Sequence, residues 1–237
     1  DTDETNKMRN NLEGINALLD RTWIDIYISD EEHIKLNEEM DRKPDKNPID
    51  FTRRKLRRIF NNSSFEHGGR FYHGWWQEIP SAYRKYITIS GKLTEEEDFS
   101  GIHIRMLYAF EDIELGSEDT YLIEGYGAKY RKQVKVALNT IINAKTKEKA
   151  INSINRELTL PKNKTAKDLF NQLELKHPKI AKYFATGIGI ELQYKDSIIA
   201  EKVILRLARD NIVALPVHDS FIVIMSHIND LKEEMNK

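Results

Sequence analysis

The segment that most constrains the fold lies near the end of the chain, at residues 214–225, and reads ALPVHDSFIVIM. Two apolar runs rich in β-branched residues flank His218 and Asp219, a pattern typical of two buried strands joined by a polar turn. The pattern predicts a β-hairpin whose tip carries an ionisable pair. A carboxylate held at the end of a strand is a suitable metal ligand, although an ordinary hairpin produces the same pattern.

A second hairpin is predicted at 86–98, YITISGKLTEEED, where apolar and polar residues alternate on both sides of Gly91. Its second strand leads into FSGIHIRMLYAF at 99–110, where apolar residues recur at helical spacing and Ser100 is the expected N-cap. Asp98 therefore lies where a strand ends and a helix begins. Asp98 and Asp219 are 121 residues apart in the chain, and both are expected at strand ends.

Between these acids, YRKQVKVALNTIINA at 130–144 reads as a helix. Arg131, Lys135, Asn139 and Asn143 recur every fourth residue and therefore share one helix face. Two cations and two amides in a row suit contacts to a triphosphate and a sugar, and a face that is simply exposed to water fits equally well. A further amphipathic helix is expected at 188–210, with Gln193 and Asp196 near its start.

The densest positive segment is DFTRRKLRRIF at 50–60, which we interpret as a helix that starts at Asp50 or Thr52. Its cations are Arg53, Arg54, Lys55, Arg57 and Arg58. The following segment, 61–80, contains paired glycines, Arg70 and several aromatic residues. Glycine permits close backbone approach, and arginine with aromatic side chains suits phosphate contacts and base stacking. A helix face exposed to solvent is the alternative for the basic segment.

Composition restricts the general class of the protein. The 237 residues include 37 basic and 38 acidic ones, so no global field attracts nucleic acid or membrane, and any nucleic-acid surface must be local. The absence of cysteine excludes disulfides and thiolate metal sites. The polar, acidic start DTDETNKMRN is unlike a signal peptide, and no run approaches the roughly 20 apolar residues of a membrane span. We therefore expect a cytoplasmic protein with no membrane partner.

These patterns predict an α+β fold with a central antiparallel sheet packed on helices, including helices at 99–110 and 197–209. Residues 1–49 are expected to form a helical or mixed N-terminal segment with a possible strand at 22–28 and a linker at 41–48. Residues 50–97 would hold the basic and aromatic segment and the first hairpin. Residues 98–237 would hold the remaining sheet, the second hairpin and a small helical region at about 119–185.

In its motifs the chain resembles the polymerase core of family A DNA polymerases and single-subunit phage-type RNA polymerases. DFSGIHIR at 98–105 resembles the first carboxylate motif of the DNA enzymes, D-Y-S-x-I-x-L-R, and RKQVK at 131–135 resembles the start of their R-x-x-x-K helix motif. VHDSF at 217–221 is similar to the second carboxylate motif, which is H-D-E in the DNA enzymes and H-D-S-F in the RNA enzymes. GGRFY at 68–72 resembles the R-G-R-x-Y element of the RNA enzymes, and KDS at 195–197 resembles their L-D-A/S. The order of these motifs agrees over about residues 50–225.

This resemblance implies a palm-like sheet, reduced helical fingers and template-directed nucleotidyl transfer with two Mg²⁺ ions, for which Mn²⁺ could substitute. Asp98 and Asp219 would be the metal ligands, with Ser100 or a neighbouring carbonyl completing the shell. Arg131 and Lys135 would hold the triphosphate of a dNTP or rNTP, and His218 would contact the primer end. Arg53, Arg54, Arg57 and Arg70 would contact phosphates of the DNA template, and Gln193 would read the minor groove of the primer–template duplex. Further replication proteins are possible partners.

Two departures from the motifs fall on sugar and base selection. His103 stands where the DNA enzymes place a glutamate that blocks a 2′-hydroxyl, and Asn139 and Asn143 replace an aromatic residue and a tyrosine. The spacings are also short, with 33 residues from Asp98 to Arg131 and 84 from Lys135 to Asp219. They imply a compact polymerase or the catalytic piece of a larger assembly.

Two other classes of protein remain open from the sequence. A metal-dependent phosphohydrolase of the His-Asp type would use His218 and Asp219 as metal ligands, but that class needs its ligands on helices with further histidines before the pair. A non-catalytic nucleic-acid-binding relative of polymerases would keep the basic and aromatic segment without using the acids. Primer extension, nucleotide hydrolysis and binding without turnover separate the three classes.

Overall fold

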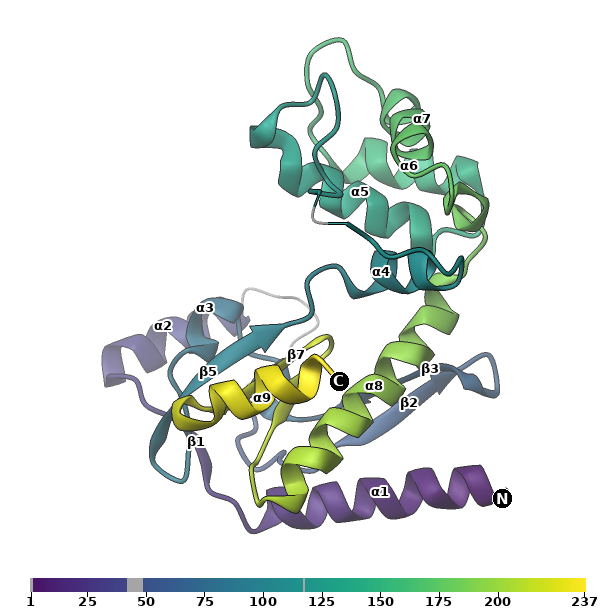
Figure 1. Cartoon of the computed structure of the whole chain (residues 1–237). Helices are drawn as coiled ribbons and strands as arrows, with labels where there is room; N and C mark the ends of the chain where they lie inside the picture. Colours follow the sequence, from purple (N-terminus) through teal and green to yellow (C-terminus); the bar gives the residue numbers. More distant parts are fainter. Residues whose placement is uncertain (1, 42–48, 117) are drawn as a thin grey trace. The chain divides into compact units, whose positions relative to one another are not determined.

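The computed structural model describes residues 2–41, 49–116 and 118–237, so the expected linker lies outside the described residues except for Asp41. The chain forms two compact units. Unit 1 comprises residues 1–100 and 194–237, and unit 2 comprises residues 101–193. Each unit is described by itself below, with the element labels of Figure 1.

Unit 1 contains a curled five-stranded antiparallel sheet with the strand order β1-β4-β5-β7-β6. Its strands are β1 (Ile24–Ile26), β4 (Ile87–Ile89), β5 (Lys92–Asp98), β6 (Leu215–Val217) and β7 (Ser220–Ile224). Both predicted hairpins are confirmed, because β4 pairs with β5 around Gly91 and β6 pairs with β7 around His218 and Asp219. β5 also pairs with β7, which joins the two hairpins into one sheet. The predicted α+β class with an antiparallel sheet packed on helices is therefore confirmed.

The helices of unit 1 bury apolar residues against this sheet. Residues of α1, β4, β7 and α8 meet in one core, which also holds Trp75 and Trp76, both fully buried. Figure 1 shows α9 beside β5 and β7. The helices are α1 (Asp3–Asp20), α2 (Asp30–Asp41), α3 (Ser81–Arg84), α8 (Gly189–Arg209, whose first residues belong to unit 2) and α9 (Ile228–Met235). Among the described residues, no helix has both the length and the apolar content to cross a membrane.

The predicted basic helix at 50–60 is wrong. Residues 50–56 form turns and irregular backbone, and β2 (Arg57–Asn61) follows and pairs with β3 (Ser64–Tyr72) as a separate two-stranded sheet. The strand forms because Arg58 and Phe60 turn towards the protein while Arg57 and Ile59 face solvent, a period of two rather than 3.6. The five cations therefore do not share a helix face.

Unit 2 is helical and has its own core. It contains α4 (Ile102–Ala109), α5 (Arg131–Asn143), α6 (Lys147–Glu157) and α7 (Ala166–Lys176). The helices predicted at 99–110 and 130–144 are thus confirmed, but the N-cap of α4 is Gly101, in a left-handed conformation, and not Ser100. Thr146 and Thr165 cap α6 and α7 by accepting backbone hydrogen bonds. Apolar faces of all four helices, including Leu107, Ile141, Ile154 and Phe170, pack together.

Candidate active site

Asp98 and Asp219 lie at the same end of two neighbouring antiparallel strands. Asp98 is the last residue of β5 and is opposite Ser220, the first residue of β7, so Asp219 is one residue away from this pair. The amide of Phe99 donates a hydrogen bond to the carbonyl oxygen of Asp219, with an N–O distance of 3.0 Å. Directly opposite residues of antiparallel strands have Cα atoms about 4.5–5.5 Å apart. The sheet therefore brings together two acids that are far apart in the chain.

Both acidic side chains are accessible, since Asp98 is exposed and Asp219 is half-buried. Within the described residues, neither carboxylate makes a hydrogen bond or a salt bridge to another side chain. Asp219 does interact electrostatically with Arg70 and His218. Two accessible carboxylates that are not neutralised by direct contacts are suited to a hard divalent cation.

Arg70 of β3 is held beside this site by a buried carboxylate. Its guanidinium donates to both oxygens of Asp196 on α8, at 3.1 and 3.0 Å from Nε, and a further hydrogen bond runs from its terminal nitrogen to Oδ2. The Asp196 side chain is only 2% exposed. Burial disfavours the charged guanidinium, but the bonds to Asp196 and the charges of Asp196 and Asp219 outweigh burial and raise the pKa of Arg70. Arg70 is therefore a fixed positive charge near Asp219, and its bonds to Asp196 restrict the predicted phosphate contact.

His218 occupies a left-handed conformation at the turn, with a φ of 59°. Its ring contacts Tyr72 of β3 edge-to-face, with 5.6 Å between the ring centroids. Desolvation by the surrounding protein, followed by the positive charge of Arg70, lowers the pKa of His218 below its usual value. The imidazole is thus biased towards its neutral form, which can accept a hydrogen bond from a hydroxyl group.

Ser220 and Glu96 stabilise the turn that carries Asp219, and our sequence analysis did not identify them. The Ser220 hydroxyl donates to Glu96 Oε1, with an O–O distance of 2.5 Å, and lies 3.0 Å from the Val217 carbonyl oxygen. Glu96 also accepts a hydrogen bond of 2.8 Å from Nε of Arg84. Only the strand register brings Glu96 close to Ser220. The one indication in the sequence is that Glu96 lies two residues before Asp98 in a predicted strand, so the two side chains are expected on the same face of the sheet.

The β2–β3 hairpin is attached to α8 by a buried arginine. Arg58, 3% exposed, donates to Ser197, Glu201 and the carbonyl oxygen of Gly69. Gly69 has a φ of 79°, and a Cβ atom there would lie 3.0 Å from Ser197 Oγ and 2.9 Å from the Phe60 ring. The absence of a side chain at Gly69 thus allows β3 to pack closely against α8. This hairpin positions Arg70 near Asp219 and Tyr72 against His218.

The basic and aromatic side chains of residues 50–80 are mostly engaged within the protein. Arg53 pairs with Glu78 at 3.0 Å, and Arg54 donates to the carbonyl oxygen of Thr22. Arg57 is exposed, and its side chain makes no hydrogen bond or salt bridge with another described residue. Of the aromatic residues, Phe71, Trp75 and Trp76 lie in the core. Lys55 is exposed but lies 3.8 Å from a carboxylate oxygen of Asp20. The extended nucleic-acid surface expected here is therefore reduced mainly to Arg57 and the exposed Phe65.

The face predicted on α5 exists in unit 2, since Arg131, Lys135, Asn139 and Asn143 are all exposed. Nε of Arg131 donates to Asp119 at 2.5 Å, and the bond raises the pKa of Arg131 and lowers that of Asp119. Arg131 and Lys135 both lie over the ring of Tyr121, at 5.1 and 5.9 Å from its centroid. Arg131 is paired with Asp119, whereas Lys135 makes no ion pair with another described residue, so Lys135 is the more available of the two for a ligand.

The amides of α5 have structural contacts as well. Asn143 donates to the Asn139 carbonyl oxygen at 2.8 Å, and a Cβ atom at Gly189 would lie 2.1 Å from Asn143 Oδ1. Asn139 and Asn143 also line a pocket of about 690 Å³ between α5 and α6. Of the other predicted site residues, His103 and Gln193 are half-buried in unit 2, and Ser100 is exposed and ends the first of the two segments of unit 1.

Asp98 and Asp219 could supply only part of the ligands of a Mg²⁺ ion. No group of three or more His, Cys, Asp or Glu side chains that could hold a metal occurs among the described residues. Mg²⁺ is commonly bound by one or two carboxylates, with waters and substrate phosphates as its other ligands. Asp98 and Asp219 fit that arrangement, whereas a structural site made only of protein ligands does not fit.

Comparison with known proteins adds no assignment, because neither a protein-family model nor a curated protein matches this chain. The chemistry of the candidate site therefore rests on its residues and their geometry.

Proposed function

We propose that the protein is a template-directed nucleotidyltransferase, a compact polymerase that uses two Mg²⁺ ions bound through Asp98 and Asp219. The observation that carries the proposal is the position of these acids at one end of β5 and β7, with no direct side-chain partner among the described residues. The order of the motif-like segments DFSGIHIR, RKQVK and VHDSF supports it.

The reaction forms a bond between a primer 3′-oxygen and the α-phosphorus of a nucleotide, and it breaks the bond to pyrophosphate. Mg²⁺ bound to the two carboxylates would stabilise the charge that develops on the attacking and leaving oxygens. His218, with its lowered pKa, can accept a hydrogen bond from the primer 3′-hydroxyl. Arg70, held by Asp196, places a fixed positive charge near Asp219.

The two alternatives are less well supported by the site. In a His-Asp phosphohydrolase the metal ligands lie on helices, whereas His218 and Asp219 lie in a β-turn between β6 and β7. A non-catalytic nucleic-acid-binding protein would need the basic and aromatic segment, most of which is engaged in internal contacts. Nucleotide hydrolysis without extension would favour the first alternative, and binding without turnover the second.

The test is primer extension on a primed DNA template with Mg²⁺, comparing the wild type with Asp98→Asn and Asp219→Asn. We expect each substitution to reduce turnover at least about a hundredfold, because the loss of several kcal/mol of transition-state stabilisation has that effect. Binding of the primer–template should change little, since the carboxylates act on the transition state. Glu95→Gln, an exposed acid on the same strand, is the matched control and should remain active. Substantial turnover by Asp219→Asn would show that its carboxylate is structural.

A further inference from the structure

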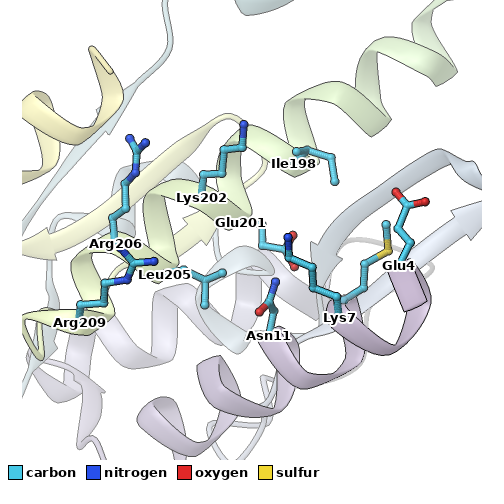
Figure 2. A pocket seen from close by; sticks show the side chains of 10 residues that line it. Glu4, Lys7, Asn11, Ile198, Glu201, Lys202, Leu205, Arg206 and Arg209 are labelled. Atoms are coloured by element: carbon cyan, nitrogen blue, oxygen red, sulfur yellow. The ribbon is translucent and has the colours of Figure 1, made fainter. Parts of the chain in front are cut away.

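A groove between α1 and α8 has the character of a binding site for a polyanion. It lies within unit 1, has a volume of about 510 Å³ and is shown in Figure 2. The two helices run side by side in the same direction, because Tyr194 donates to Glu4 near one end and Arg21 donates to Asn211 near the other. None of the residues that line the groove belongs to the candidate active site.

One wall of the groove is a row of cations on α8. Lys202, Arg206 and Arg209 are four and three residues apart, a spacing that places them on one face of the helix. At 1.5 Å per residue the row extends about 10 Å along the helix axis. This length exceeds the size of one phosphate group, so the row can contact neighbouring phosphates of one strand. A row of charges suits a chain of phosphates better than it suits a single phosphate group.

The opposite wall, on α1, adds Lys7 and the amide of Asn11, which are one helical turn apart. In Figure 2 both side chains extend from α1 into the groove. Met8, Ile198 and Leu205 supply apolar surface between the two walls, against which sugar and base faces can pack. The groove thus combines cations, a hydrogen-bonding amide and an apolar floor.

The acids near the groove are largely bound to other partners. Glu201 pairs with the buried Arg58 at 3.3 Å, and Glu4 accepts the hydrogen bond from Tyr194. Arg206 pairs with Glu234 of α9 at 3.3 Å. Lys7, Lys202 and Arg209 are exposed, and they make no ion pair with another described residue. In a protein with a formal net charge of −1, three such cations around one groove form a local positive site.

We propose that the α1–α8 groove binds single-stranded nucleic acid through its phosphates, as a second contact separate from the site of Asp98 and Asp219. The inference rests on the proposed function, in that an enzyme copying a template handles unpaired strands. An acidic protein segment is the competing occupant, and the experiment below separates the two. The phosphate contacts make binding sensitive to salt and independent of base sequence.

The experiment measures binding of a fluorescent 20-nucleotide oligo-dT to the full chain by anisotropy, without Mg²⁺ or nucleotides, across a range of KCl concentrations. The groove variant is Lys7→Gln/Lys202→Gln/Arg209→Gln, which removes three exposed cations. We expect the groove variant to lose at least tenfold in affinity at low salt. We also expect the slope of log K against log[KCl] to become less negative by about 2, because each phosphate contact to a single strand contributes about 0.7 to that slope. The matched control, Lys35→Gln/Lys92→Gln/Lys167→Gln, removes the same charge from exposed positions elsewhere and should bind within about twofold of the wild type.

Equal losses of oligo-dT affinity in the groove variant and the control would show that binding depends only on the net charge of the protein, and would overturn the proposal. Wild-type affinity in the groove variant would overturn it as well, as would failure of the wild type to bind oligo-dT. Tighter binding of a poly-glutamate peptide than of oligo-dT would identify the occupant as an acidic protein segment. Because this measurement needs no turnover, its failure is distinguishable from failure of the proposed polymerase activity.

Discussion

His177 is the most deeply buried titratable side chain of unit 2 and joins three segments. Its ring lies 2.9 Å from the Tyr108 hydroxyl through Nδ1 and 3.0 Å from the Thr120 carbonyl oxygen through Nε2. Only 2% of the residue is exposed. Both contacts suit a neutral imidazole that donates from Nε2 and accepts at Nδ1. Desolvation is the first cause that lowers the pKa of His177, and the charge of Lys176 acts in the same direction.

The lowered pKa makes stability depend on pH in a defined direction. Above the unfolded pKa of about 6.5 His177 is neutral in both states, so its stabilising contacts are fully present. As the pH falls from about 6.5 towards the folded pKa, the unfolded chain binds the proton first and the free energy of unfolding decreases, by about 1.4 kcal/mol per unit of pKa difference. Thermal melting between pH 8 and pH 5 should therefore show a steeper loss of Tm for the wild type than for His177→Gln. His67→Gln, on the β2–β3 hairpin, is the control and should follow the wild type. If Tm falls with pH in the same way for His177→Gln and the wild type, the pH dependence does not come from the lowered pKa of His177.

His103 is the residue at which we expect the sugar to be selected. In the DNA polymerases that the motif at 98–105 resembles, a glutamate at the matching position occupies the space that a 2′-hydroxyl needs, whereas histidine can also donate a hydrogen bond to that hydroxyl. We expect the wild type to favour dNTPs only weakly, because the D-x-S-x-I-x-x-R spacing at 98–105 follows the DNA enzymes while the glutamate is missing. His103→Glu should increase the preference for dNTPs roughly tenfold to a hundredfold, which corresponds to about 1–3 kcal/mol. Incorporation efficiencies for matched dNTP and rNTP pairs measure this. Strict use of dNTPs by the wild type, unchanged in His103→Glu, would refute the weak selection.

At the level of elements, the exposed face of α5 can be tested separately from the rest of that helix. If Lys135 holds the triphosphate as the proposed function requires, Lys135→Ala should raise the KM for the nucleotide roughly tenfold, because a charge-assisted hydrogen bond to a phosphate is worth about 1.5–3 kcal/mol. Lys132→Ala removes another exposed lysine of the same helix, three residues earlier and outside the row formed by every fourth residue from Arg131, and is the matched control. Steady-state kinetics of extension distinguish the two. Equal effects in both variants would show that α5 contributes only general positive charge.

The attachment of the β2–β3 hairpin to α8 gives a prediction about stability. Arg58 and Glu201 are 3% and 9% exposed and make a salt bridge of 3.3 Å. Removing one partner leaves an unpaired buried charge, so Arg58→Gln should destabilise unit 1 by about 3–5 kcal/mol. The exposed neighbour Arg57→Gln should cost less than about 0.5 kcal/mol. Denaturant unfolding measures both variants, and similar losses would contradict the structural role of Arg58.

The sequence predicts elements well where the hydrophobic period is strong. Alternation around Gly91 and around His218 predicts both hairpins, and apolar spacing in 130–144 and 188–210 predicts α5 and α8. The helix predicted at 50–60 is wrong because a dense run of arginines carries no clear apolar period. The structure of this segment depends on Arg58 reaching Glu201, 143 residues later, and no local pattern encodes that pairing.

For the molecule as a whole, the sequence predicts the two acids of the candidate site but only part of their surroundings. Asp98 and Asp219 are identifiable because each ends or follows an apolar strand pattern. The fixation of Arg70 by Asp196 depends on contacts between residues 126 positions apart, which periodicity cannot predict. The contact between Ser220 and Glu96 depends in the same way on strand register, over 124 positions. Burial and pairing, rather than residue type, decide which cations remain available to a ligand.

Single-nucleotide incorporation on four primed templates that differ only in the templating base tests whether the protein copies a template. We predict that, with Mg²⁺, the wild type adds mainly the nucleotide complementary to each base, whether dNTPs or rNTPs are offered. Asp98→Asn and Asp219→Asn should add none at a comparable rate, while Glu95→Gln remains active. Incorporation that ignores the templating base, or equal incorporation by the wild type and both Asp variants, would show that Asp98 and Asp219 do not support template-directed synthesis.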